Sequence, residues 1–144
     1  MATFPSKRLR RLRINPNIST IVQEVRLSVN DLVCPIFVEE GLKEKKPVGS
    51  MPDIVRLPLS EISNEVQNIS DLKIPAVMLF GIPSQKDESG TSAYAENGIV
   101  QKAISEIRSN FGDKISIMAD VCLCHYTSSG PCGIINETKI DNEQ

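Results

Sequence analysis

The chain has 144 residues, of which 40% are hydrophobic and 24% are charged, and its formal net charge is −2 at pH 7. This length allows one domain with a buried core, and the composition is ordinary for a soluble globular protein. The small negative charge argues against a nucleic-acid binder or a membrane-surface protein, and no run approaches the roughly 18 apolar residues of a membrane-spanning helix.

The first 30 residues precede any predicted strand, and we expect them to form an arm or a leading helix. They contain an amphipathic stretch around residues 18–27. No acidic residue precedes Glu24, and the basic cluster before it is Lys7, Arg8, Arg10, Arg11 and Arg13. We interpret this cluster as a solvated or subunit-contacting arm, with RNA or anionic lipid as the alternative contact. The start of the chain lacks the apolar region of a secretory signal, so we predict a cytoplasmic location. A transit peptide is the alternative, because Arg-rich, acid-poor starts also occur in that class.

Three short apolar runs are predicted as buried parallel strands, because their apolar residues do not alternate with polar ones. They span residues 32–38, 76–80 and 115–121. Pro35 cannot donate a hydrogen bond to a neighbouring strand, so we expect it at a sheet edge or at the start of its strand.

Two helical patterns lie between these runs. The first has Ser60 as its expected N-cap, and its apolar positions are Leu59, Ile62, Val66, Ile69 and Leu72. The second covers residues 98–110 and stops at Gly112; its apolar stripe is Val100, Ala103, Ile104, Ile107 and Phe111. Strands alternating with helices predict an α/β fold of right-handed βαβ units.

A polar, turn-rich loop at residues 83–97 follows the second strand. In an α/β barrel such loops lie at the catalytic face. We interpret Lys86 and Asp87 in this loop as a solvated pair, with a functional role as the alternative.

Three cysteines after the third strand carry the strongest chemical signal. Cys122, Cys124 and Cys132 have the spacing C-x-C-x7-C in a Gly- and Ser-rich loop. Three thiolates suit zinc and leave its fourth position open to water or substrate. The alternatives are three reduced thiols in a loop, or a closed site completed by His125. Cys34 is expected to be a buried core residue and not a ligand.

These cysteines stand in a longer pattern that resembles the porphobilinogen synthase family, also called delta-aminolevulinic acid dehydratase, from about residue 7 to residue 142. The segment from Asp120 to Gly133 is similar to its zinc-dependent members. The other matching segments are residues 8–13, 31–38, 40–41, 50–52, 79–83, 86–87 and 98–101. Two positions depart from the family pattern: His125 replaces an acidic residue and Pro131 replaces a histidine.

The resemblance implies a (β/α)8 barrel, zinc on Cys122, Cys124 and Cys132, and condensation of two 5-aminolevulinate molecules to porphobilinogen with loss of water, on the path to haem. Zinc would help to bind and polarise the second substrate molecule, and Asp120 is the candidate substrate-binding residue. A strand-end carboxylate that caps a loop is the alternative role for Asp120. The resemblance also implies a homo-octamer held through the arm, while an additional magnesium site stays open because family members vary in it.

The predicted strands are centred near residues 35, 78 and 118, and eight strands at that spacing would need about 320 residues. We therefore expect an arm at residues 1–30 and, at residues 31–144, the first three βα units of a truncated barrel. The two catalytic lysines of the family, one of which forms a Schiff base, are expected beyond Gln144. The chain's own lysines are assigned to the arm, loops or helices: Lys7, Lys43, Lys45, Lys46, Lys73, Lys86, Lys102, Lys114 and Lys139. The alternative is a non-catalytic zinc- or thiol-binding module from a truncated gene product.

Overall fold

A computed structural model describes residues 10–130, 132–136 and 139–141. Its centre is a five-stranded sheet with the order β2-β3-β1-β4-β5. The strands are β1 (Val33–Glu39), β2 (Lys46–Pro47), β3 (Val55–Leu57), β4 (Ala76–Ile82) and β5 (Ser116–Ala119). Strands β3, β1, β4 and β5 are parallel, and only β2 runs antiparallel to its neighbour.

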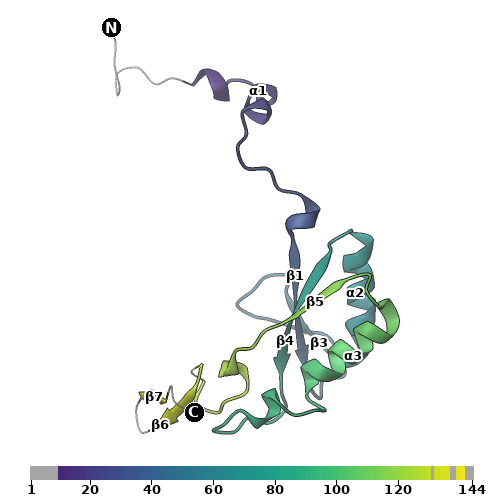
Figure 1. Cartoon of the computed structure of the whole chain (residues 1–144), viewed down its shortest axis with the longest axis vertical. Coiled ribbons are helices and arrows are strands. Elements are labelled where there is room, and N and C mark those ends of the chain that lie inside the picture. The colour runs from purple at the N-terminus through teal and green to yellow at the C-terminus, as the bar shows by residue number, and fades with distance from the viewer. Residues whose placement is uncertain (1–9, 131, 137–138, 142–144) are drawn as a thin grey trace.

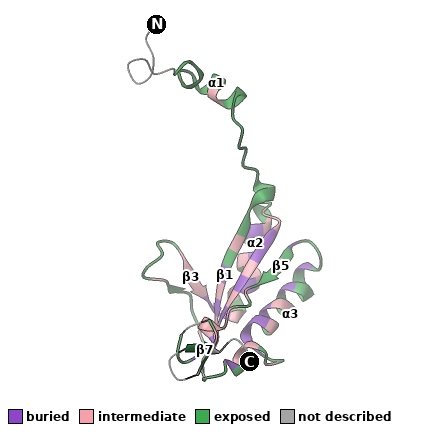
Figure 2. Ribbon diagram, turned by 60° about the vertical axis from the view of Figure 1, so that its left-hand side comes forward, coloured by how far each residue is buried: buried purple, intermediate pink, exposed green. Residues whose placement is uncertain are grey.

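Two helices, α2 (Ile62–Asp71) and α3 (Ile99–Phe111), pack on the same face of this sheet (Figure 1). Between helices and sheet lies one hydrophobic core, in which each fully buried Val, Leu or Ile side chain contributes about 1.5–3 kcal/mol. Its fully buried members, drawn in purple in Figure 2, include Val38, Ile62, Val66, Val77, Leu79, Ile107 and Ile115.

The three predicted strands correspond to β1, β4 and β5, so the strand–helix–strand order is confirmed. The third strand is shorter than predicted, because it ends at Ala119 and residues 120–121 already belong to the following loop. Strands β2 and β3 were not predicted. They have two and three residues, which is too short for an alternating or a continuous apolar strand pattern to be recognised in the sequence.

Pro35 is not at the start of β1, and β1 is an interior strand of the sheet, but Pro35 itself has an edge position, which is one of the two placements expected. Its missing N–H therefore leaves no gap in a ladder on both sides. Strand β3 pairs with β1 only at Phe37 and Val38, so the Pro35 segment of β1 has a neighbour on its β4 side alone. Locally, this part of β1 is an edge.

The ends of the helices differ from the prediction at two residues. Ser60 is not an N-cap, because it lies inside a 3-10 turn, η3 (Leu59–Glu61), and α2 begins at Ile62 without a side-chain cap. Leu72 does not join the apolar stripe: it follows the helix and is 67% exposed. The second helix is as predicted, with Gly112 in a positive-φ conformation directly after Phe111.

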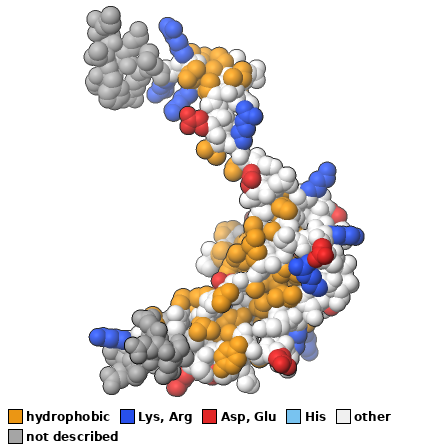
Figure 3. Space-filling view, in the orientation of Figure 1, with side chains coloured by type: hydrophobic (Ala, Val, Ile, Leu, Met, Phe, Trp, Pro, Cys, Tyr) orange, Lys and Arg blue, Asp and Glu red, His pale blue; other side chains and the backbone are white. Residues whose placement is uncertain are grey.

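The opposite face of the sheet is covered by no helix among the described residues. Phe37 and Phe80 are paired in register on this face and stack with ring centroids 5.1 Å apart. One row earlier, Pro35, Met78 and Met118 stand side by side. Figure 3 shows the hydrophobic side chains gathered in a band across the sheet domain. A parallel sheet is normally buried on both faces, so this face has the character of the inner wall of an incomplete barrel.

The segment before β1 extends away from the sheet domain (Figure 1). It contains η1 (Arg11–Arg13), α1 (Pro16–Ile21) and η2 (Val29–Asp31). From residue 10 to residue 32 every residue is exposed except Ser19, which is half-buried. The predicted amphipathic stretch is helical only as far as Ile21. Nothing in the described part of this chain covers its apolar side chains.

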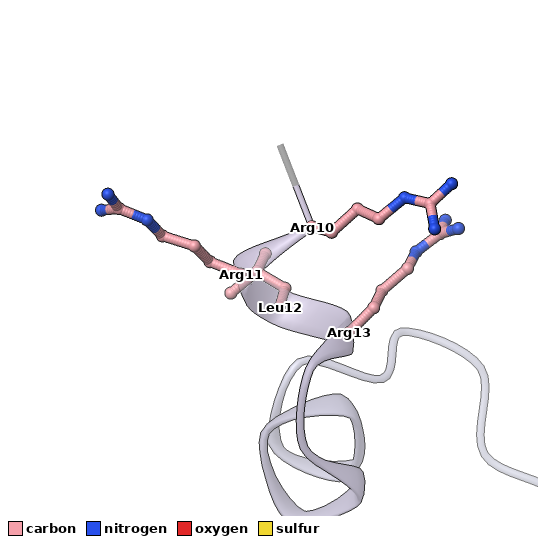
Figure 4. Close-up of a pocket in the computed structure, with 4 residues that line it drawn as sticks. All are labelled: Arg10, Arg11, Leu12 and Arg13. Carbon is pink, nitrogen blue, oxygen red and sulfur yellow. The ribbon is translucent and has the colours of Figure 1, made fainter. Parts of the chain in front are cut away.

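The basic cluster is described from Arg10 onward. The side chains of Arg10 and Arg13 extend to one side of η1 and that of Arg11 to the other, around Leu12 (Figure 4). Within residues 10–130, 132–136 and 139–141, no carboxylate forms an ion pair with these three arginines. Lys7 and Arg8 lie outside the described residues.

The end of the described chain contains a further element that the sequence analysis did not predict. Strands β6 (Ile134–Asn136) and β7 (Lys139–Asp141) pair as a separate antiparallel hairpin. No helix of the described residues is long and apolar enough to cross a lipid bilayer.

Candidate metal centre

The parallel strands β1, β4 and β5 end at the same edge of the sheet, and the loops that follow them carry the candidate site. After β1, the carboxylate of Glu40 accepts hydrogen bonds from the backbone N–H (3.1 Å) and the hydroxyl (2.9 Å) of Ser84, which follows β4. Lys102 of α3 lies 3.6 Å from the same carboxylate. The Ser84 hydrogen bonds, with help from Lys102, lower the pKa of Glu40. This contact joins the first two loops.

The three cysteines lie in the loop after β5, which we call the cysteine loop (residues 122–132; Pro131 lies outside the described residues). The Cys122 Sγ is 3.1 Å from the Cys124 Sγ and 2.9 Å from the Cys132 Sγ. A 3-10 turn, η5 (Leu123–His125), begins directly after Cys122 and positions Cys124. All three sulfurs lie within 4.8 Å of one another, so the spacing C-x-C-x7-C does bring them together.

The close thiols affect one another's protonation. Hydrogen bonds with Cys132 and Cys124 lower the pKa of Cys122, against the smaller effects of burial and of the negative charge on Asp120. The hydrogen bond with Cys122 raises the pKa of Cys124 to about 11, and contact with Cys122 also raises the pKa of Cys132. Contact among the three thiols therefore lowers the pKa of Cys122 and raises the pKa values of Cys124 and Cys132.

The donor set suits a thiophilic metal such as zinc. Zinc binds thiolate sulfur at about 2.3 Å, and in a tetrahedral site two such sulfurs lie about 3.8 Å apart. The observed separations of 2.9 and 3.1 Å are shorter by less than 1 Å, which small side-chain rotations can supply. Cys122 and Cys124 are half-buried and Cys132 is exposed, so the cluster can be reached from solvent.

His125 is not a member of the cluster that the described residues form. Its ring makes an edge contact with Phe80, with centroids 6.3 Å apart. The alternative of a closed Cys3His site therefore has no support in this geometry. Cys34 lies in β1 and packs against the core, but it is half-buried and not fully buried as predicted, and burial raises its pKa.

Asp120 is the first residue after β5. Its backbone N–H donates to the Leu79 carbonyl oxygen (3.1 Å), and its half-buried side chain is close enough to oppose ionisation of Cys122 and Cys132. Asp120 and Cys122 also line a cavity of about 320 Å³, whose remaining wall is largely apolar and includes residues of α3. The structure thus places Asp120 beside the thiols, while its role in binding substrate stays a prediction.

Lys86 and Asp87 differ in their exposure to solvent and in their contacts. Lys86 is exposed, as expected of a solvated residue. Asp87 is half-buried and accepts hydrogen bonds from Ser89 and Thr91, which lower its pKa; its backbone is paired with the cysteine loop. The description as a solvated pair is therefore wrong for Asp87.

Sequence reasoning missed the residue that anchors the cysteine loop, Tyr126. It is 6% exposed, and its hydroxyl lies 2.5 Å from the position that a Cβ on Gly81 would occupy. A tyrosine in a polar loop gives no periodic signal, so only the three-dimensional contact identifies it.

Three comparisons with known proteins show what the chain as a whole is similar to. The sequence model of the family described as delta-aminolevulinic acid dehydratase matches residues 6–144. The delta-aminolevulinic acid dehydratase of Archaeoglobus fulgidus is 47% identical over 144 residues, which are 100% of this chain and 44% of that protein. That of Bacillus subtilis is 45% identical over 137 residues, covering 95% of this chain and 42% of the relative.

Among solved structures, the chain is similar to delta-aminolevulinic acid dehydratase (porphobilinogen synthase) from Toxoplasma gondii, crystallised in complex with the reaction product porphobilinogen. The TM-score is 0.85 at 31% sequence identity, over 95% of this chain and 40% of that one. The predicted fold class, part of an α/β barrel, is thereby confirmed. The chain spans about two fifths of the length of these similar proteins.

Proposed function

This chain belongs to the delta-aminolevulinic acid dehydratase family, and from that premise we propose that it is the metal-binding part of a porphobilinogen synthase. The reaction would be the condensation of two 5-aminolevulinate molecules to porphobilinogen with loss of water, in tetrapyrrole synthesis. The observation that carries the proposal is the cluster of three thiols within 4.8 Å of one another, in the loop that follows a parallel barrel strand.

The proposed metal is zinc, held by Cys122, Cys124 and Cys132. Bound there with three protein ligands, zinc would supply a Lewis acid with a free coordination position for a substrate oxygen. The chain's own contribution is to present the thiols at the sheet edge, with Cys122 and Cys124 half-buried, Cys132 exposed and the pKa of Cys122 lowered. An additional magnesium site stays open.

Asp120 is the proposed substrate-binding residue. A carboxylate at the end of β5, beside the thiols and in the lining of a mostly apolar cavity, can attract and orient a substrate ammonium group. This assignment is supported by its placement beside the thiol cluster and by the match of its position to the family pattern.

We assign no Schiff-base lysine to residues 1–144. Such a lysine needs a pKa lowered by burial or by a second cation. Lys102, the described lysine on α3, is instead ion-paired with Glu40. Two other lysines lie in strands, Lys46 in β2 and Lys139 in β7, which corrects the expectation that none would. Neither strand belongs to the β1–β4–β5 wall, so we propose that the catalytic lysines are outside this sequence and that the chain alone is inactive.

We further propose that residues 1–30 are an arm that contacts another copy of the protein, and that residues 31–144 are the barrel part. Residues 1–30 carry six basic side chains and one acidic side chain, while residues 31–144 carry ten basic and seventeen acidic ones. These opposite net charges favour contact between the arm of one copy and the body of the next. A homo-octamer is the assembly that the family resemblance suggests, with no nucleic acid or membrane as partner and a cytoplasmic location.

The alternative is a zinc- or thiol-binding module without catalysis of its own. The coding sequence downstream of Gln144 separates the two, because only an enzyme requires further βα units with two suitably placed lysines.

Elemental analysis tests the metal proposal directly. The reduced, purified chain should hold one zinc, and a variant with Ala at positions 122, 124 and 132 should hold none. Full zinc content in that triple variant would refute the assignment. X-ray absorption of the loaded chain should give three sulfur neighbours at about 2.3 Å.

A further inference from the structure

The cysteine loop is held at its midpoint by the preceding loop of the chain. Asp87 pairs with Thr127 as an isolated parallel β-bridge. The Asp87 N–H donates to the Tyr126 carbonyl oxygen (3.4 Å), and the Ser128 N–H donates to the Asp87 carbonyl oxygen (2.9 Å). Within the clamped segment 126–128, Tyr126 and Thr127 are buried and Ser128 is exposed.

The side chain of Asp87 shapes the turn that makes this contact, which we call the Asp87 turn (residues 87–91). Its carboxylate accepts from the Ser89 N–H (3.1 Å), the Thr91 N–H (3.0 Å) and the Thr91 hydroxyl. Gly90, with φ +64°, takes the left-handed conformation that the turn requires. The carboxylate therefore fixes the conformation of a turn whose backbone holds the cysteine loop.

A second, independent contact lies at Gly90. A Cβ at this position would be 3.4 Å from side-chain atoms of Leu123, Tyr126 and Thr127. The backbone of the Asp87 turn is thus packed directly against the segment that follows Cys122, in addition to its hydrogen bonds with residues 126–128.

The clamped segment lies between two of the three thiols. On one side, the N–H groups of Tyr126 and Thr127 donate to the Leu123 carbonyl oxygen (2.9 and 3.0 Å), so the segment is continuous with the turn that carries Cys124. On the other side, Gly130, with φ +86°, precedes Cys132, whose Sγ lies 2.9 Å from that of Cys122. Fixing residues 126–128 thus limits where Cys132 can lie relative to Cys124.

We propose that Asp87 is a positioning residue for the metal site: its carboxylate holds the Asp87 turn, which holds the cysteine loop so that the three thiols converge. Asp87 does not itself touch the metal. This inference rests on the proposed metal site, and it assigns a role to a residue that lies far before the first ligand in the chain.

The test is titration of the reduced 144-residue chain with Co²⁺, whose absorption on thiolate binding reports both affinity and geometry. Asp87→Ala should weaken binding about tenfold, the lower range for loss of a group that orients ligands, and should alter the Co²⁺ spectrum. Asp87→Asn should stay within about threefold, because its amide oxygen can still accept from Ser89 and Thr91. Glu88→Gln is the matched control, since it removes a charge from an exposed residue of the same turn and should change nothing.

The outcomes separate the two proposals. Unchanged Co²⁺ affinity and spectrum in Asp87→Ala, with the far-ultraviolet circular dichroism of the parent chain, would overturn the positioning role. So would equal losses in Asp87→Asn and Glu88→Gln, because these would indicate an effect of charge alone. If Asp87→Ala does not fold, Thr91→Val takes its place, and full affinity in that variant overturns the inference. Failure of the parent chain to bind Co²⁺, or binding that survives loss of all three cysteines, would instead refute the proposed metal site.

Discussion

Replacing Gly81 by Ala should destabilise the protein and loosen its cysteine loop. Gly81 lies in β4 beneath Tyr126, and an added Cβ would be 2.5 Å from the Tyr126 hydroxyl, 2.5 Å from a Val100 methyl and 3.1 Å from an Ile99 methyl. Ordinary van der Waals contacts begin near 3.4 Å, so two buried neighbours must each move by about 1 Å.

The size of the effect follows from two opposing terms. Overpacking of this kind costs about 1–3 kcal/mol. The φ of Gly81 is not in the left-handed region, so Ala also gains about 0.4–1 kcal/mol by restricting the unfolded chain. The net loss should be about 1–2 kcal/mol, which lowers the urea midpoint by roughly 1 M.

Urea unfolding of four chains tests the reasoning as a double-mutant cycle: the parent, the two single variants Gly81→Ala and Val100→Ala, and the double variant. Val100→Ala removes one clashing methyl, so it should cost stability in the parent chain but cost less, or restore stability, in the chain that already carries Gly81→Ala. An unchanged midpoint for Gly81→Ala would show that the close approach is not a constraint. Equal costs of Val100→Ala in both backgrounds would show that the two side chains do not compete for this space.

Three further predictions concern pH, catalysis and association. The pKa of Glu40 is lowered in the folded state, so its contribution to stability is present above its unfolded pKa of about 4.3 and is lost as the pH falls through the folded value. The urea midpoint should therefore fall less between pH 5 and pH 3 in Glu40→Gln than in the parent chain. Borohydride reduction in the presence of labelled 5-aminolevulinate should fix no label on residues 1–144, and a labelled lysine would contradict the placement of the catalytic lysines elsewhere. The chain alone should self-associate or be poorly soluble, because the edge of β5 and one apolar sheet face are uncovered by the described residues. A chain that sediments as a monomer and unfolds in a sharp calorimetric transition would contradict this prediction.

Much of the fold was accessible from the sequence, because buried parallel strands and amphipathic helices leave local patterns. Strand β4 and helix α3 were both recognised from continuous apolar runs and from three- and four-residue spacing. Strand β3 and the hairpin β6–β7 were missed, since three-residue strands owe their existence to their neighbours in the sheet. Ser60 shows the limit of capping rules, because a preceding 3-10 turn moved the start of the helix beyond it.

The candidate site divides in the same way. The thiol cluster could be predicted because its three members lie close together in the chain and their chemistry is distinctive. The roles of Asp87, Gly81 and Tyr126 could not, because each depends on a contact between loops that are far apart in the chain. A backbone hydrogen bond between two loops does not require particular residue types and cannot be recognised in the sequence. A cluster of three thiols requires three cysteines, which can be recognised.

The arm before β1 has a thermodynamic consequence. From Arg10 to Leu32 it buries almost nothing against its own chain, and α1 has six residues where an isolated helix needs about 12–15 to persist in water. In the proposed assembly, where residues 1–30 contact another copy of the protein, ordering of the arm and docking of the arm would be one coupled equilibrium. Part of the gross interaction energy would then be spent on ordering the arm, so the affinity between the proposed subunits would be lower and could be changed through helix propensity alone. Substitutions at solvent-facing positions of residues 16–21 would then change assembly without altering a single intersubunit contact.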